Sequence, residues 1–177
     1  MAVEQFNLAD GQRAERKRLI TVAEWTETVG TTPTQMREIL GRRTEDSSIE
    51  YNPDIQTSTD ILGINYTDVN KTQPQQDFDP FLILGGSKLG AFLNDKRKRN
   101  ALSELSSFTL YIITAFVGDA TNGYSAEKHE DCTILYNSMG GDANVNMPIS
   151  VYFSNKVTSG TVDKLSDDFT FTPDVTL

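Results

Sequence analysis

Polar and hydrophobic residues alternate over residues 47–61, which read SSIEYNPDIQTSTDI. Apolar or β-branched side chains occupy the odd-numbered positions from Ile49 to Ile61, and polar side chains occupy the positions between them. Strict alternation predicts a β-strand with two different faces, but this pattern continues far beyond the about 5–6 residues of an average strand. Pro53 has no backbone N–H group, so we expect a bend at Asn52-Pro53.

The alternation changes phase at Gly63, after which the even-numbered Ile64 and Tyr66 carry the apolar side chains. A shift by one residue exchanges the two faces of a strand, and a glycine at the shift indicates a turn or bulge. The pattern therefore predicts a long hairpin over about residues 47–73, with arms at 47–61 and 64–73. We expect this hairpin to protrude, because it is too long for a single sandwich.

A second pattern, at residues 87–98, predicts one short helix. Ser87 is a favourable N-cap, and Leu89, Phe92 and Leu93 recur at the spacing of one helical face. The basic run KRKR at 96–99 falls in the last turn, where positive charge complements the helix dipole. We favour this interpretation of the basic run over a nucleic-acid-binding patch.

The rest of the chain has the pattern of β-structure. The stretch FTLYIITAFV at 108–117 is apolar at nearly every position, which predicts a strand buried on both faces. We predict a mainly β fold, a β-sandwich or barrel flanked by one short helix, with the long protruding hairpin. A single domain at 21–172 would follow a flexible arm at 1–20 and precede a C-terminal tail at 173–177. Further strands are expected near residues 19–25, 132–136, 147–153 and 167–172. A short apolar segment at 36–40 ends at Gly41.

Composition and charge narrow the function classes. The chain has 177 residues, 37% of them hydrophobic, which is enough for one folded core. Its formal net charge of −9 repels nucleic acid, so specific DNA binding is disfavoured. No apolar run reaches the length of a membrane span, and the polar N-terminus lacks the apolar segment of a signal peptide. We therefore expect no membrane partner and a protein made in a reducing cytoplasm.

The sequence contains no convincing catalytic or metal-binding set. One cysteine, Cys132, and one histidine, His129, cannot form a disulfide or a zinc site of the usual kind. We expect His129 at a solvated strand end and the two side chains on opposite strand faces. The acid pairs at 130–131 and 167–168 lack the further oxygen ligands that calcium requires. The glycines at 85–86 precede a helix, where an anion could bind, but no P-loop follows. The prediction is a protein that is not an enzyme and has no cofactor or metal.

The hairpin is the feature that requires an explanation. Unpaired strand edges recruit other chains, and such a ribbon is useful when it pairs with another copy of the same protein. Head-to-tail contacts of this kind generate rings. The predicted self-assembly residues are the apolar positions of the ribbon: Ile49, Tyr51, Ile55, Ile61, Ile64 and Tyr66.

Four segments, taken in their order along the chain, resemble the major tail tube proteins of tailed bacteriophages and prophages of Gram-positive bacteria. These segments are the ribbon with its flanks from GRRTED to QQDFDP, FLILGGSKLGAFL, SMGGDANVNMPISVYFS and GTVDKLSDDFTF. The resemblance covers roughly residues 40–172, and residues 1–40 fit it less well. It implies a β-sandwich flanked by a helix, six copies in a ring, and rings stacked into a hollow tube. The hairpin would then reach a neighbouring subunit, and the N-terminus would make a second contact.

The same resemblance implies the partners and the location. The subunit would bind itself, the tape-measure protein, and tail-terminator and tail-tip or baseplate proteins, and DNA would only pass through. It would be assembled in the host cytoplasm and reside in the virion tail. An acidic lumen would let DNA slide, because it repels phosphates. Candidate lumen-facing acids are Glu50, Asp54, Asp60, Asp142, Asp167 and Asp168, and the alternative that they face outer solvent is equally open.

Other hypotheses remain. The chain could be a related tail component, such as a terminator, a baseplate tube piece or the tube of a phage-tail-like bacteriocin. The type of tail, contractile or not, is left open. A non-phage β-sandwich binding module would show a cleft with exposed aromatic residues, and the sequence has a single tryptophan. An enzyme is disfavoured by the missing catalytic set.

Overall fold

The computed structural model describes residues 5–29 and 31–174. The predicted N-terminal arm and C-terminal tail therefore lie in part, at residues 1–4 and 175–177, outside the described residues. Within the described chain the fold is mainly β with one α-helix, so the predicted fold class is confirmed. The α-helix is not long and apolar enough to cross a membrane.

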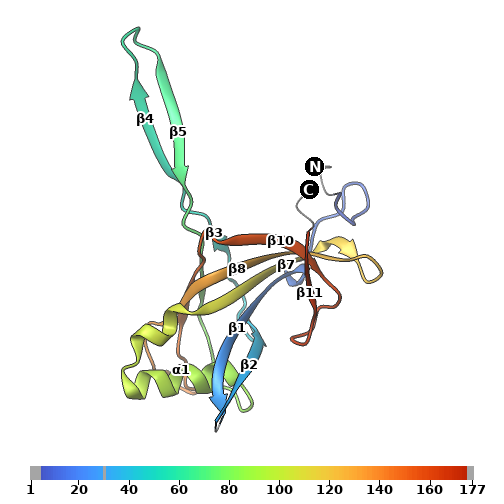
Figure 1. Cartoon of the computed structure of the whole chain (residues 1–177), viewed down its shortest axis with the longest axis vertical. Helices are drawn as coiled ribbons and strands as arrows, with labels where there is room; N and C mark the ends of the chain where they lie inside the picture. Colours follow the sequence, from blue (N-terminus) through green and yellow to red (C-terminus); the bar gives the residue numbers. More distant parts are fainter. Residues whose placement is uncertain (1–4, 30, 175–177) are drawn as a thin grey trace.

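A large antiparallel sheet forms the body of the molecule (Figure 1). Its path runs β2-β1-β7-β8-β9-β6-β3, and β10 and β11 continue from β8 in a second direction. The bounds are β1 Leu19–Val29, β2 Thr32–Ile39, β3 Ile49–Glu50, β6 Gln75–Phe78, β7 Phe108–Asp119, β8 Gly123–Tyr136, β9 Ile149–Tyr152, β10 Val157–Val162 and β11 Phe171–Pro173.

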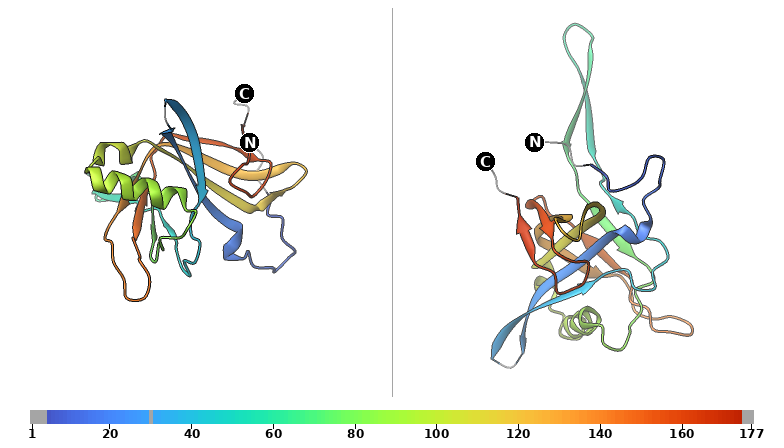
Figure 2. Two further views of the ribbon diagram at one scale, coloured as in Figure 1. Left: turned by 90° about the horizontal axis from the view of Figure 1, so that it is seen from below. Right: turned by 90° about the vertical axis from the view of Figure 1, so that its right-hand side faces the viewer.

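Strand β8 is the branch point of this sheet. One edge pairs with β7, while the other edge pairs with β10 over residues 124–129 and with β9 over residues 133–136. Between these two segments Asp131 has a positive φ of 57°, and the β7–β8 register shifts there. Such a bulge bends a strand and increases its twist. The two halves of the sheet therefore diverge from β8, as the views in Figure 2 show.

Two predictions about residues next to this bulge were wrong. His129 is buried, with 4% of its surface exposed, and does not lie at a solvated strand end. Its Nδ1 lies 3.0 Å from the carbonyl oxygen of Ser154, and its ring packs against Phe153. Cys132 is buried as well, because the extra residue at Asp131 resets the alternation, so the prediction of opposite faces was wrong.

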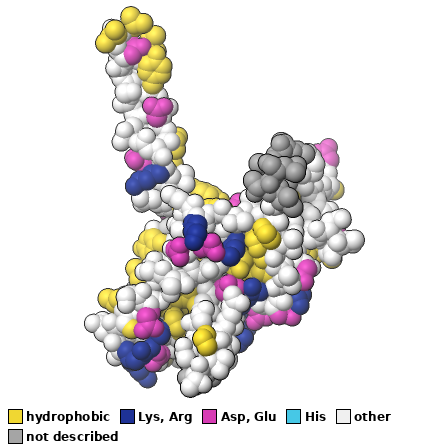
Figure 3. Space-filling model, viewed as in Figure 1, with side chains coloured by type: hydrophobic (Ala, Val, Ile, Leu, Met, Phe, Trp, Pro, Cys, Tyr) yellow, Lys and Arg dark blue, Asp and Glu magenta, His cyan; other side chains and the backbone are white. Residues whose placement is uncertain are grey.

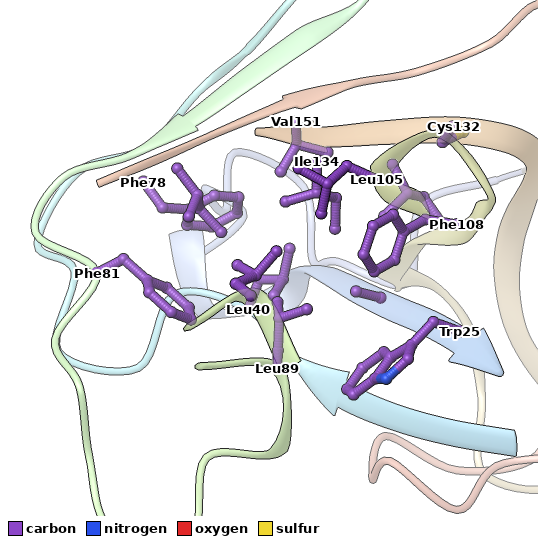
Figure 4. Packing of buried hydrophobic residues seen from close by; sticks show 14 of the residues in the cluster. Trp25, Leu40, Phe78, Phe81, Leu89, Leu105, Phe108, Cys132, Ile134 and Val151 are labelled. Atoms are coloured by element: carbon purple, nitrogen blue, oxygen red, sulfur yellow. The ribbon is translucent and has the colours of Figure 1, made fainter. Parts of the chain in front are cut away.

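Strand β7 is buried on both faces, as its apolar sequence predicts. Leu110 and Ile112 enter the main core, to which residues of the helix also belong. Figure 4 shows the packing of this core. Tyr111 and Ile113 enter a second core on the opposite face, which Phe169 helps to close. Burial of each such side chain stabilises the fold by about 1.5–3 kcal/mol relative to exposure.

Helix α1, Lys88–Arg99, closes the main core. The Ser87 hydroxyl accepts a hydrogen bond from the Gly90 N–H at 3.0 Å, which confirms the predicted N-cap. The basic run occupies the last turn, as predicted. Within it Lys96 forms an ion pair with Glu104, and Arg99 forms one with Asp95.

The part of the predicted N-terminal arm that the structure describes contacts the body at two places. The short 3₁₀ helix η1, Arg16–Arg18, leads directly into β1. Further towards the N-terminus, the Asn7 N–H donates to the Phe116 carbonyl at 2.7 Å, and Phe6 packs edge-on against the Phe116 ring. Residues 9–17, between these contacts, are exposed.

Candidate functional site: the protruding hairpin

Strands β4, Asp54–Thr59, and β5, Asn65–Lys71, form a separate two-stranded sheet. Figure 1 shows this hairpin projecting from the body beyond β3. The long predicted ribbon is therefore two elements, because Ile49 and Glu50 pair with β6 in the main sheet. The interruption falls at Asn52, whose φ is 42°, next to Pro53. A positive φ at a non-glycine residue is uncommon and marks a turn, which agrees with the bend predicted at this site.

The turn at the free end of the hairpin is organised by the Asp60 carboxylate. Its Oδ1 accepts hydrogen bonds from the N–H groups of Leu62 at 2.8 Å and Ile64 at 2.9 Å. Its Oδ2 accepts one from the Tyr66 hydroxyl at 2.9 Å. Gly63 supplies the positive φ of 80° that the turn requires. These bonds, led by that from Ile64, lower the pKa of Asp60 below its usual range.

The organised turn presents apolar side chains to solvent. Ile61 is fully exposed, Leu62 is 78% exposed, and Ile64 is about half exposed. Figure 3 shows these side chain types gathered at the free end of the hairpin. An exposed apolar cluster of this kind marks an interaction surface. Asp60, predicted as a lumen-facing acid, is placed here as the group that shapes that surface.

The two faces of the hairpin differ from those expected. Ile55 lies opposite Val69 on one face, whereas Tyr66 lies opposite Ser58 on the other. The sequence pattern placed Ile55 and Tyr66 in one assembly set and omitted Val69, which is 60% exposed. The signal for Val69 is the register that a turn centred on residues 61–63 imposes on the two arms.

The two remaining predicted assembly residues lie before the bend. Ile49 is partly buried and packs against the main core, so it is a residue of the body. Tyr51 is about half exposed, and its carbonyl accepts a hydrogen bond from the Gln73 N–H at 3.0 Å. The structure therefore gathers Ile61 and Ile64 at the tip, and leaves Ile49 and Tyr51 at the base.

The six predicted lumen-facing acids do not form one cluster. Asp54 lies opposite Lys71 in the strand register at the base of the hairpin, and Asp60 lies at the tip. Asp142 lies in the loop between β8 and β9. Asp167 and Asp168 lie in the loop before β11, where the Lys164 ammonium and the Ser166 hydroxyl lower the pKa of Asp168 to about 2.

Glu50 has acidic neighbours that the sequence pattern did not indicate. It lines a shallow pocket of about 240 Å³ together with Asp46, Asp77 and Asp79. These residues come from two separate stretches, 46–50 and 75–79, which the β3–β6 pairing brings together. Within the described chain, however, no group of three or more acid, histidine or cysteine side chains is arranged to hold a metal ion.

The positions considered for catalysis or anion binding are occupied by structural contacts. Burial raises the pKa of the Cys132 thiol, which keeps it protonated and weakly nucleophilic. At the start of α1, the Glu38 carboxylate accepts hydrogen bonds from the Ser87 hydroxyl at 2.8 Å and the Leu89 N–H at 2.9 Å. A side chain of the protein thus already fills the anion position next to Gly85 and Gly86.

A deeper pocket lies on the body. It has a volume of about 390 Å³ and is bordered by η1, the start of β1, the 39–47 segment and β6. Leu19, Ile20 and Ile39 form its partly exposed apolar wall. Arg16 and Lys17 lie at its rim and are exposed.

Comparison with solved structures finds a weakly similar chain. A chain in the cryo-EM structure of the anti-feeding prophage baseplate, symmetrised six-fold, aligns with a TM-score of 0.44 and 10% sequence identity. The alignment covers 82% of this chain and 94% of that one. No protein-family model and no curated protein sequence matches the chain.

Proposed function

We propose that this protein is a structural, non-enzymatic subunit of a phage tail tube that assembles with copies of itself into rings, most simply hexameric, and stacked tubes. The observation that carries the proposal is the hairpin. All thirteen residues of β4 and β5 are exposed, although they carry Ile55, Tyr66 and Val69. A two-stranded hairpin is marginally stable alone in water, so we expect a neighbouring copy to pack against it and stabilise it.

The charge distribution supports the same proposal. The net charge of −9 is repeated in every copy, and the body carries the acidic pocket formed by Asp46, Glu50, Asp77 and Asp79. In an assembly in which this pocket lines the channel, the wall would be acidic, which would repel phosphate groups and let DNA pass without binding. Tape-measure, terminator and tail-tip or baseplate proteins would be the other partners, and the virion tail would be the location.

Electron microscopy and sedimentation of the purified protein test the proposal. We expect hollow tubes or stacked rings for the wild type, and loss of these particles when Ile55 and Ile61 are both replaced by aspartate. Leu102→Asp, at an exposed apolar residue of the body, is the matched control and should still assemble. A wild-type protein that stays monomeric at all concentrations would contradict the proposal. Single rings without tubes would favour a terminator or baseplate piece instead.

A further inference from the structure

The pocket bordered by Arg16, Leu19, Ile39 and Phe78, called here the β1–β6 pocket, is preformed. Its walls include the partly exposed Ile20 and the buried Leu40, which with Phe78 appears among the core residues in Figure 4. The volume of about 390 Å³ exceeds the roughly 150 Å³ that accommodates benzene in a protein cavity. It is therefore large enough for an aliphatic side chain from another molecule.

A chain of hydrogen bonds holds the pocket open. Thr21 Oγ1 donates to Gln76 Oε1 at 2.7 Å, and Gln76 Nε2 donates to Ser47 Oγ at 3.1 Å. Ser47 Oγ in turn donates to the Asp77 carbonyl at 2.6 Å. Arg16 Nε donates to the Ser47 carbonyl at 3.0 Å and so ties η1 to the same segment. These polar groups already have partners, so an apolar occupant leaves none of them unsatisfied.

We propose that the β1–β6 pocket receives the hairpin tip, Ile61 and Leu62, of a second copy of this chain. This inference rests on the proposed self-assembly and names the partner surface of the hairpin. The tip of the same chain cannot enter the pocket, because β4 alone extends about 20 Å at about 3.3 Å per residue and points away from the body (Figure 1). Tip and pocket can therefore meet only between copies, in a head-to-tail contact that propagates.

Shape and charge of the two surfaces agree. The tip is held in one conformation by Asp60, so little conformational freedom is lost when it binds. The hairpin carries the acids Asp54, Asp60 and Asp68 and one cation, Lys71, so it is net negative. The pocket is lined by two exposed cations, Arg16 and Lys17, and one acid, Glu45, so it is net positive. Attraction between them orients the approach, while Ile61 and Leu62 provide the apolar surface that is buried.

Paired cysteines test the contact in assembled particles. The double variant Leu62→Cys, Glu45→Cys places one thiol at the tip and one at the exposed edge of the pocket. The native Cys132 is buried and does not compete. With a short bifunctional maleimide we expect a ladder of covalent dimers and higher species on a denaturing gel. The control pair Leu62→Cys, Leu102→Cys keeps the tip thiol and moves the other to an exposed site of the body; its yield should be at least tenfold lower.

The outcomes separate this proposal from the function on which it rests. Wild-type particles together with a ladder from the Glu45 pair alone support both. Particles with no ladder, or with equal ladders from both pairs, overturn the pocket as the receptor and leave the tail-tube proposal standing. A wild-type protein that forms no particle overturns both. A second variant, Ile61→Ser, should lower particle yield at least tenfold, whereas Leu102→Ser should not; equal yields would count against the tip.

Discussion

Strands β7 and β4 show two different ways in which this chain forms β-structure. The twelve residues of β7 lie between β1 and β8, and side chains from both of its faces are buried. The six residues of β4 pair with β5 and are exposed along their whole length. Packing holds β7, whereas a cross-strand ladder and the Asp60 turn hold the hairpin. The body is thus complete in one chain, and under the proposed function the hairpin would be completed by another.

The largest difference is expected from truncation of a side chain in each region. Ile113→Ala removes a fully buried side chain of β7 and should lower the free energy of unfolding by about 2–5 kcal/mol. Leu62→Ala removes exposed atoms at the tip and should change it by less than about 0.5 kcal/mol, while reducing assembly. Urea unfolding measures both values. Comparable losses for the two variants would show that the tip belongs to the folding core.

A buried ion pair should show the next largest effect within the body. Arg37 pairs with Glu24, donates to the Phe169 carbonyl at 2.6 Å, and lies over the Phe169 ring. Arg37→Ala leaves the Glu24 carboxylate buried without its cation, which should cost about 3 kcal/mol, measured by urea unfolding. Arg37→Lys keeps the positive charge, so it should lower the free energy of unfolding by less than Arg37→Ala does. An unchanged midpoint for Arg37→Ala would mean that this cluster does not secure the C-terminal segment.

Tyr111, in the same cluster, predicts how stability depends on alkaline pH. Burial, reinforced by the neighbouring Glu24 carboxylate, raises the pKa of Tyr111 from 10.0 to about 12. Because the folded-state pKa is raised, this group stabilises the fold fully below pH 10 and loses that contribution as the pH rises to about 12. The midpoint temperature of thermal unfolding should fall as the pH rises between these values, and Tyr111→Phe should make it depend less on pH. If the unfolding temperature of Tyr111→Phe fell equally steeply with pH, another group would be responsible for the dependence.

The smallest and most local effect is expected at Asp60. Asp60→Ala removes the acceptor of the Leu62 and Ile64 N–H groups, so hydrogen exchange at residues 62–66 should become faster while global unfolding is unchanged. Asp60→Asn retains one acceptor oxygen, so its exchange rates should lie between those of the wild type and Asp60→Ala. Because the pKa of Asp60 is lowered, the turn should stay ordered down to the pH at which an ordinary aspartate titrates and should loosen only at more acidic pH. Exchange rates that do not respond to Asp60→Ala would show that the backbone alone forms the turn.

Patterns local in sequence were sufficient for much of this fold. Alternation around Gly63 predicted the hairpin, Ser87 predicted the start of α1, and the apolar run at 108–117 predicted a strand buried on both faces. The bulge at Asp131 carries no such signal, and for that reason His129 and Cys132 were predicted on opposite faces. The burial of His129 was missed because its neighbours in sequence are charged. A single inserted residue reverses every later side chain of a strand.

Of the two proposed interaction surfaces, the sequence pattern predicted the hairpin tip and missed the pocket. Ile61 and Ile64 lie three positions apart, on either side of the turn at Gly63, so their exposure follows from the local pattern. The β1–β6 pocket, by contrast, is made from segments near residues 16–21, 39–47 and 76–78. Strands β1 and β6 are not neighbours in the sheet, so only the tertiary fold brings these segments together. The acidic pocket around Glu50 was missed for the same reason.

Hydrogen exchange of the hairpin, measured in the free subunit and in assembled particles, tests most directly whether neighbouring copies complete it. In the free subunit we expect the amides of residues 54–71, including those that bond to Asp60, to exchange much faster than those of β7, which are protected in both states. On assembly we expect the amides of residues 54–71 to become strongly protected. Strong protection of the hairpin already in the free subunit, or no gain on assembly, would contradict the account.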